Sequence, residues 1–518
     1  MKRKYILFPL TFVLLLTTLS SCKKYLDINR DPNLPADVTE KLMLPAIIGT
    51  FSYEVAGGYP TRTATLWTKH LAYAGADRHS GSYYLTENDV DNFWRFSSYN
   101  SVMGTAVEMI AKAEKNGNPS YAAIGRIILA WNLSYLTECY GSIPYSDAFK
   151  AEQGVIKPKY DTQEDIYKEI QKLLDQSIVD AGKGTGLKPG VDDFIYGGVM
   201  QSWVHLANTL KARFYLRLSN APGYNAATQA DLALKALDAG AITDKDAPTA
   251  TYFSVANAEN PWYQFAIGGK WNFSTKPSQY YVNLLLGDDE IPGTLDPRLP
   301  FQVSVVPKGS DPANPGVNAG KYVGVTNDGP PLNIANYSPI GSFYSARNAK
   351  LNLLVYAEVP FIRAEAEFLK ANKSVNAAVV AAYNEGVAAS MTFYGIDVNP
   401  STSSAETKAY LAYPDHVINL ATSSTDAYRR IMQQKYIANY LQFEAYNDFR
   451  RTGYPVLPIN DEVYAPDVDL VNKPEMGIIP LRLPYPSSER SYNKENIPSD
   501  IPINTVNAMQ IPVWWDKK

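Results

Sequence analysis

Aromatic and charged side chains gather in a short, turn-rich stretch that begins at residue 67 of the 518-residue chain. Flat aromatic rings stack on the C–H faces of sugar rings, and carboxylate or guanidinium groups hydrogen-bond to the hydroxyls. The stretch supplies both kinds of group, which predicts ligand binding. In the alternative interpretation, Trp67 and Tyr73 belong to the core and the rest is a surface loop. The candidate ligand-binding residues are Trp67, Tyr73, Asp77, Arg78, Tyr83 and Tyr84.

A second group of aromatic residues lies in a long stretch, 242–354, that is dense in glycine, proline, asparagine and aspartate. Ordered loops of this length are usually functional. Trp262, Trp271 and Tyr337 are therefore further candidates for contact with a ligand. The alternative is a small satellite core that packs beneath long loops.

No catalytic or metal-binding motif includes the four histidines, His70, His79, His205 and His416. The His-Glu-x-x-His, Gly-x-Ser-x-Gly, P-loop and EF-hand patterns are missing, so we expect neither an enzyme nor a metal or cofactor. His205 has apolar neighbours, which favours a hydrogen-bonded structural role. A glycosidase needs only two carboxylates at a set separation. The 52 acidic residues therefore leave a glycan hydrolase open as the alternative.

The first 22 residues have the pattern of an export signal that ends in a lipid anchor. Three basic residues at positions 2–4 precede an apolar run over 5–19, which is shorter than the ~20 residues that a spanning helix needs. Leu19-Ser20-Ser21-Cys22 resembles the bacterial lipobox, in which the cysteine thiol receives a diacylglyceryl group before cleavage. We expect residues 1–21 to be a signal peptide, Cys22 to be lipidated, and residues 22–37 to form a polar tether.

Charge and cysteine content narrow the possible partners and cross-links. The formal net charge is −4, and loss of the three basic residues with the signal leaves −7. A mildly acidic chain gives no electrostatic case for nucleic-acid binding. Cys139 is the second of two cysteines, so a chain lipidated on Cys22 has no intrachain disulfide.

Apolar residues at helical spacing predict a mostly α-helical body. The spacing predicts helices over 121–140, from a capping pair of Asp161 and Glu164 to about 181, over 198–219, over 227–239 and over 427–451. Consecutive helices of this kind suggest hairpins of the tetratricopeptide type, with the loop-rich stretch as an insertion. We expect one domain over 38–518. A scaffold that uses its hairpins to bind protein partners is a third functional alternative.

Four segments resemble the SusD/RagB-like nutrient-binding lipoproteins, in particular the SusD-like 2 branch. They occur in the order typical of that family and are scattered over nearly the whole mature chain. The segments are Cys22–Asn29 with Asp31-Pro32-Asn33, Arg363–Ala366, Tyr440–Pro455 and Arg482–Glu489.

The resemblance implies an α-helical fold with four tetratricopeptide-like hairpins and an irregular ligand-binding half. It implies an outer-membrane lipoprotein that faces the cell surface. It also implies a partner, a SusC-like TonB-dependent β-barrel transporter, over which the lipoprotein lies as a hinged lid. The function would be to bind an oligosaccharide, or in some members a peptide, and to pass it to the barrel.

Replacement of Cys22 tests the expected anchor. Two acyl chains are enough for stable membrane attachment. The wild-type chain should therefore incorporate labelled palmitate in cells, whereas the Cys22→Ala chain should incorporate none. Labelling of the variant would contradict lipidation at this cysteine.

Overall fold

The structure is a computed structural model, in which α-helices form most of the body and strands are few. It describes residues 38–74, 83, 85–268, 270, 275–287, 293–309, 316–326, 333–459, 479–502 and 505–517. Cys22, the tether and four of the candidate residues (Asp77, Arg78, Tyr84 and Trp271) lie outside this part. Within the described residues, no helix combines the length and the apolar character needed to cross a bilayer.

The N-terminal half of the fold is built around α5, in which all 22 residues are buried. Its predicted helix at 121–140 is confirmed, and so is the burial of Cys139. The helices of this half are α2 (Glu40–Thr50), α3 (Tyr59–Trp67), α4 (Thr105–Asn116), α5 (Pro119–Tyr140), α6 (Gln163–Gly182), α7 (Met200–Arg217) and α8 (Ala226–Asp238), with π-helical segments η1 (Phe51–Ala56) and η2 (Asn92–Gly104).

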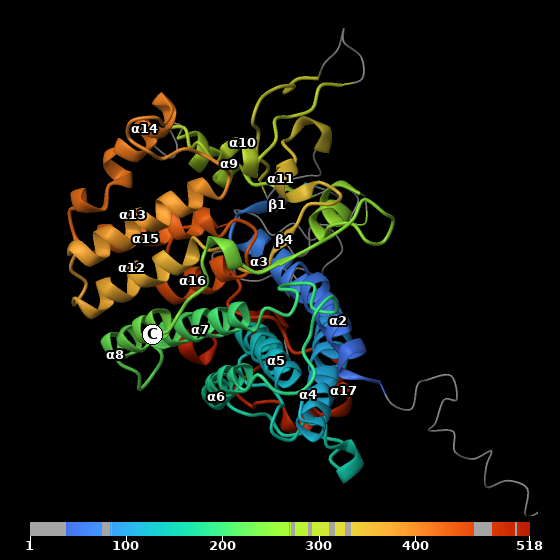
Figure 1. Ribbon diagram of the computed structural model, residues 1–518. Coiled ribbons are helices and arrows are strands. Elements are labelled where there is room, and N and C mark those ends of the chain that lie inside the picture. The colour runs from blue at the N-terminus through green and yellow to red at the C-terminus, as the bar shows by residue number, and fades with distance from the viewer. Residues whose placement is uncertain are drawn as a thin grey trace, which may run out of the picture.

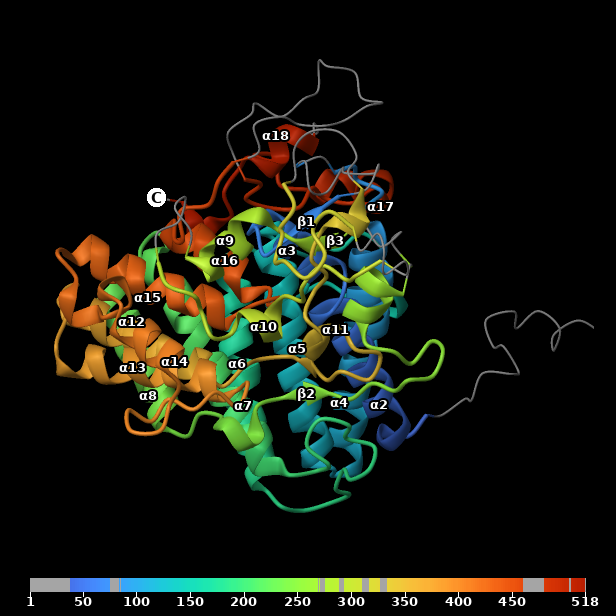
Figure 2. The same cartoon turned by 90° about the horizontal axis from the view of Figure 1, so that it is seen from above.

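Consecutive helices pack as hairpins, as expected from the sequence. The pairs are α4 with α5, α5 with α6, α7 with α8, and α12 with α13. Figures 1 and 2 place α12, α13 and α15 on one side of the molecule and α2 and α4 on the other. The later helices are α12 (Glu358–Lys370), α13 (Ala377–Thr392), α14 (Ala405–Ala412), α15 (Ser424–Ala438), α16 (Glu444–Thr452), α17 (Ser487–Tyr492) and α18 (Thr505–Met509).

Two helix boundaries predicted from the sequence are wrong. The single helix over 427–451 is interrupted between α15 and α16, where Leu441 has φ of +62°. A left-handed residue ends an α-helix, but its buried apolar side chain keeps the apolar stripe intact, so the pattern does not reveal the break. The cap of α6 is Thr162, whose hydroxyl accepts from the Asp165 N–H. Asp161 instead accepts from the backbone N–H groups of Tyr145 and Ser146.

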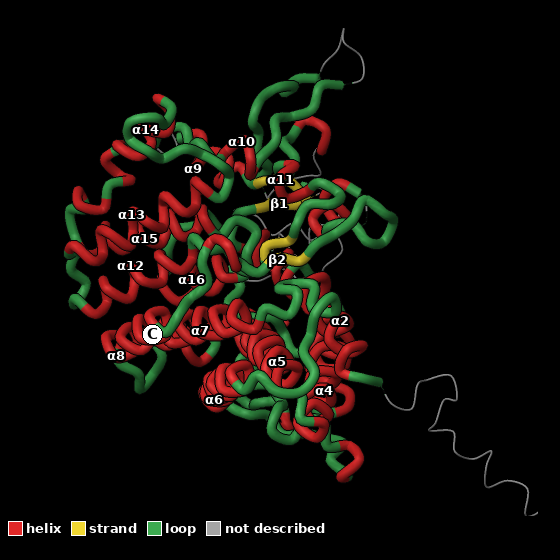
Figure 3. Tube along the Cα trace, viewed as in Figure 1, coloured by secondary structure: helices red, strands yellow, loops and turns green. Residues whose placement is uncertain are grey.

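Where the structure describes it, the loop-rich stretch carries only short elements (Figure 3). Strand β3 of this stretch pairs antiparallel with β1, which lies outside it, and β2 pairs antiparallel with β4 within it. The elements are β1 (Leu71–Tyr73), β2 (Thr249–Ala250), η6 (Tyr263–Ile267), β3 (Thr275–Pro277), α9 (Gln279–Leu286), α10 (Leu299–Gln302), α11 (Ser342–Ser345) and β4 (Leu351–Asn352).

A network of buried charges, which we call the core ion network, joins α5, α7, α12, α15 and α16. Arg451 lies in the last turn of α16, and its guanidinium pairs with Glu365 at 2.5 Å and with Asp448 at 2.9 Å. Although burial opposes it, Lys435 and Arg451 lower the pKa of Asp448 to about 2. The ion-paired members are Arg213, Arg217, Lys435 and Arg451 with Glu138, Glu358, Glu365, Glu444 and Asp448. Arg450 joins them by donating to the backbone carbonyl of Glu138 at 2.7 Å, where its charge opposes the rise in the pKa of the Glu138 carboxyl that burial causes.

A second buried pair joins the loop-rich stretch to the C-terminal helices. The guanidinium of Arg298, fully buried, pairs with Asp296 at 2.6 Å. It also donates to Ser390 Oγ of α13 at 2.8 Å and to the Tyr410 hydroxyl of α14 at 2.6 Å. Because every guanidinium bond needs its partner in place, this arginine fixes the position of the loops on the helices.

Removal of one charge from the core ion network should destabilise the fold strongly. In Arg451→Met, the carboxylates of Glu365 and Asp448 lose a buried partner, so we expect the free energy of unfolding in urea to fall by about 3–5 kcal/mol. The matched control is Lys172→Met, because Lys172 is 75% exposed and pairs with Glu169 at 3.0 Å. Its effect should stay below about 1 kcal/mol. Equal losses in the two variants would contradict this role.

Candidate ligand-binding site

The pairing of β1 with β3 brings together segments that are about 200 residues apart in the sequence. Leu71 pairs with Pro277 and Tyr73 with Thr275. Beside the strands, Ala72, Ala74 and Val325 form a small buried cluster, against which Tyr337 packs. The two stretches selected from the sequence therefore meet at this pair of strands.

The turn from α3 into β1 has a strained residue at its centre. Lys69 is 5% exposed and has φ of +61°, an uncommon conformation for a residue with a side chain. Its carbonyl accepts a hydrogen bond from Ser278 Oγ, and the carbonyl of Thr68 accepts one from the Tyr436 hydroxyl at 2.7 Å. Such strain costs roughly 1–3 kcal/mol and persists where the surroundings fix the backbone, often beside functional sites.

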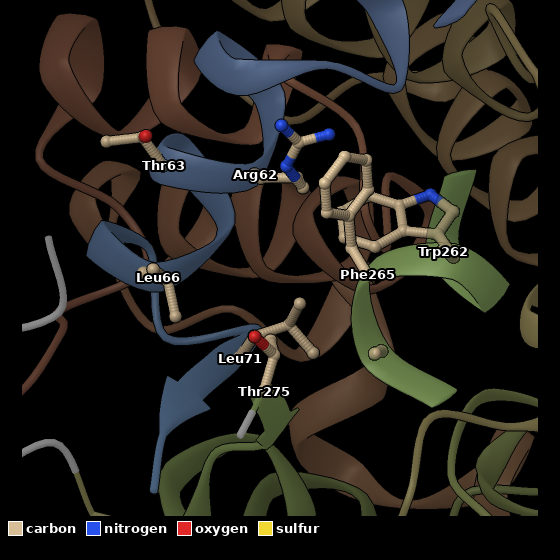
Figure 4. Close-up of a pocket in the computed structure, with 8 residues that line it drawn as sticks. Arg62, Thr63, Leu66, Leu71, Trp262, Phe265 and Thr275 are labelled. Atoms are coloured by element: carbon tan, nitrogen blue, oxygen red, sulfur yellow. The ribbon is translucent and has the colours of Figure 1, made fainter. Parts of the chain in front are cut away.

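A small pocket lies between α3, β1, β3 and η6 (Figure 4). Leu66, Leu71 and Trp262 form much of its apolar wall, and the rings of Trp262 and Phe265 lie near the guanidinium of Arg62 in the close-up. The cavity volume is about 10 Å³, on the order of a single water molecule. Among the described residues the pocket is thus too small for a sugar ring, and we call its lining the floor of the candidate site.

Cations and aromatic rings alternate at the edge of this pocket. The Arg62 guanidinium lies 3.5 Å from the centre of the Phe265 ring, and burial lowers the pKa of Arg62 to about 10, so it stays charged at neutral pH. Lys270 donates to the Tyr53 hydroxyl at 2.8 Å, and that hydroxyl donates to Gln264. Rings with cations and amides beside them suit a ligand that has both C–H faces and polar groups.

The described candidate residues divide by exposure. Tyr337 is half-buried, whereas Trp67, Trp262 and Tyr83 are 1%, 2% and 3% exposed and Tyr73 is 8% exposed. Trp67 packs edge-on against Tyr446, with 5.4 Å between ring centres. A ring that is fully covered by protein presents no face to a ligand, so these four rings belong to the hydrophobic core beside the candidate site.

Arg62, Phe265, Lys270 and Tyr53 were not expected from the sequence. Arg62 and Phe265 belong to α3 and η6, and their contact depends on how those elements meet. The aromatic run of Tyr263 and Phe265 within 242–354 was the available signal. Phe265 was hidden because η6 is a π-helical segment, which does not follow ordinary helical spacing.

Two histidines have structural roles. His205 donates from Nδ1 to the Asp246 carboxylate at 2.6 Å, which confirms its expected hydrogen-bonded role. His70 is fully buried, stacks on Tyr436 with 4.2 Å between ring centres, and lies 3.2 Å through Nε2 from the Tyr436 carbonyl. Burial lowers the pKa of His70 to about 3. In the described part of the chain, no group of His, Cys, Asp and Glu side chains is arranged to bind a metal ion.

Comparisons with known proteins agree with this architecture. The model of the SusD-like 2 family, described as "Starch-binding associating with outer membrane", matches residues 32–486. No curated protein matches the sequence.

Solved structures match nearly the full length of the chain. A SusD/RagB family protein from Bacteroides thetaiotaomicron VPI-5482 is 23% identical, with a TM-score of 0.71, over 93% of this chain and 99% of that chain. A SusD homologue from Bacteroides fragilis NCTC 9343 is 23% identical, with a TM-score of 0.70, over 93% and 100%. A chitin-binding SusD homologue from Flavobacterium johnsoniae is 21% identical, with a TM-score of 0.69, over 92% and 98%. These likenesses establish the fold.

The buried imidazole of His70 should make the fold sensitive to acid. Below pH 6.5 the unfolded chain takes up a proton that the folded chain, with the His70 pKa near 3, does not bind. The contribution of the neutral His70 imidazole to the free energy of unfolding is thus complete above pH 6.5 and decreases as the pH falls towards 3. Between pH 7 and pH 5 the wild-type chain should lose about 2 kcal/mol more unfolding free energy than His70→Phe. Parallel urea-unfolding profiles would contradict this assignment.

Proposed function

The chain belongs to the SusD-like 2 family, and on that premise we propose that it is a cell-surface lipoprotein that binds an oligosaccharide and delivers it to a SusC-like TonB-dependent transporter. A peptide ligand is the less favoured form of the same proposal. The pairing of Leu71–Tyr73 with Thr275–Pro277, with Tyr337 packed beside it, carries the proposal. It supports the proposal because described residues of both aromatic stretches meet there.

The chemistry of the described edge fits a glycan. The Phe265 ring and Tyr53 offer aromatic surface, and Arg62 and Lys270 offer hydrogen-bonding groups. Asp77, Arg78, Tyr84 and Trp271, which the sequence selects, belong to the loops that adjoin this floor in the chain. Chitin-binding proteins share the fold, which supports an oligosaccharide as the ligand.

A folded body that is attached to its lipid anchor by a tether is suited to delivering a ligand to a transporter. Residues 22–37 span at most ~55 Å when fully extended, which allows the body to swing about its lipid anchor and remain over one barrel. The described part of the chain begins at Val38, whose carbonyl accepts a hydrogen bond from Lys112. In this proposal the lipid anchor and the helical body are two parts joined by the tether.

We favour binding without hydrolysis over the alternative that the chain is a glycan hydrolase. Near the candidate site, the carboxylate of Glu259 pairs with Arg347 at 2.9 Å and accepts from Gln264 at 3.0 Å. A carboxylate held by an arginine and an amide positions other side chains more readily than it transfers protons. Other acidic residues, such as Glu365 and Glu444, are used in the core ion network.

Calorimetry on the Cys22→Ala chain tests the binding proposal. Among malto-, cello- and chito-oligosaccharides, one series should bind saturably. Trp271→Ala and Tyr337→Ala should each weaken it about 2–10-fold, because a stacked ring contributes about 0.5–1.5 kcal/mol. Phe194→Ala is the matched control, since Phe194 is 55% exposed and lies between α6 and α7. Unchanged affinity in both site variants, or release of shortened sugars by the wild-type chain, would contradict the proposal.

A further inference from the structure

A second cavity opens on the helical side of the molecule and shares no lining residue with the pocket described above. It lies between η2, the loop over 144–158 and α17, and its volume is about 420 Å³. Cavities of about 300–1,000 Å³ are typical of small-molecule sites. Its chemically distinctive lining residues are Trp94, Tyr99, Asp147, Phe149, Glu489 and Tyr492.

Aromatic rings run from the floor of this groove to its rim. Trp94 is 3% exposed and lies 5.0 Å from Tyr99, and Tyr99 lies 6.3 Å from Phe149, as measured between ring centres. At the rim, Phe149 is 41% exposed and Tyr492 is 72% exposed. Two accessible rings therefore border a cavity whose floor is rigidly packed.

The backbone at Phe149 is strained. Its φ is +60°, and a bulky residue with positive φ is an outlier that is retained where surrounding structure and function require it. A glycine would adopt this conformation without strain. The chain thus carries an exposed phenyl ring at a position where its backbone favours glycine.

Hydrogen-bonding groups line the same groove. The carboxylate of Glu489 is fixed by three donors: Trp94 Nε1 at 3.3 Å, the Tyr160 hydroxyl at 2.7 Å and Asn493 Nδ2 at 3.0 Å. The Asp147 carboxylate is 34% exposed and lies 3.8 Å from Lys150. Fixed and accessible acceptors beside aromatic faces are the groups that a sugar hydroxyl and a sugar C–H face use.

We propose that this groove is a second binding site for a neutral oligosaccharide, with Phe149 and Tyr492 stacking on a sugar ring and Asp147 and Glu489 accepting from its hydroxyls. The ligand class rests on the proposed function, whereas the location rests on the groove alone. A flat protein partner is less suited, because the cavity is recessed between η2, the loop over 144–158 and α17, with Phe149 and Tyr492 exposed at its rim.

The indole of Trp94 provides a local readout for this site. The full chain with Cys22→Ala is labelled with 5-fluorotryptophan, and Trp94→Phe identifies the Trp94 ¹⁹F resonance. Maltotriose, cellotriose and triacetylchitotriose are titrated to millimolar concentration. The resonance should shift saturably with at least one of these sugars. If none of the three shifts it, the proposal is overturned.

Phe149→Gly separates a binding role from a structural one. The ring is lost and the strained backbone is relieved, so the thermal midpoint should stay the same or rise while the affinity reported by Trp94 falls about fivefold or more. Phe194→Ala should leave both values unchanged. A lower midpoint without loss of affinity, or unchanged affinity, would overturn the proposal.

The same titration distinguishes this site from the loop-rich one. Tyr337→Ala and Trp271→Ala should leave the Trp94 shift intact. If those variants change no binding at all while the Trp94 shift persists, the loop-rich site fails and the groove stands. If the Trp94 shift disappears with them, the groove is not an independent site and this inference fails.

Discussion

The core ion network is the interaction on which the rest of the structure depends. Five cationic and five acidic side chains, none more than 7% exposed, come from five helices that span the chain from residue 138 to residue 451. Buried charges are costly unless each has a partner with good geometry. The helices can therefore satisfy the network only in a narrow range of positions. This requirement gives the hairpins a defined arrangement that apolar packing alone would specify less strictly.

Contacts with the C-terminal helices fix the position of the loop-rich stretch. Arg298 links it to α13 and α14, and Tyr436 of α15 donates to the carbonyl of Thr68, 368 residues earlier in the chain. His70 packs on the same tyrosine. The strand pair at the candidate site is consequently fixed by a helix of the C-terminal half. Rigid support of this kind reduces the entropy lost when a ligand binds.

Much of the helical body could be predicted from the sequence, because apolar spacing reports directly on buried faces. The helix of 121–140 and the hairpin of α7 with α8 follow from it. The break at Leu441 was not predictable, since a left-handed leucine leaves the apolar pattern unchanged.

The candidate site was predictable in its segments and less so in its contacts. The sequence selects aromatic residues by type, but it cannot tell a ring that faces a ligand from one that packs beneath the loops. Trp67 and Trp262 are of the second kind in this structure. The cation–aromatic contact of Arg62 with Phe265 depends on the pairing of β1 with β3, which no local pattern encodes.

Hydrogen–deuterium exchange with and without a bound oligosaccharide tests the central claim, that both aromatic stretches form one ligand site on the strand pair. Amide exchange reports protection segment by segment along the native chain. The account predicts that protection appears together over 71–83, 262–278 and 333–338 when the ligand binds. Protection confined to one of these segments, or absent from all of them under saturating ligand, would contradict it.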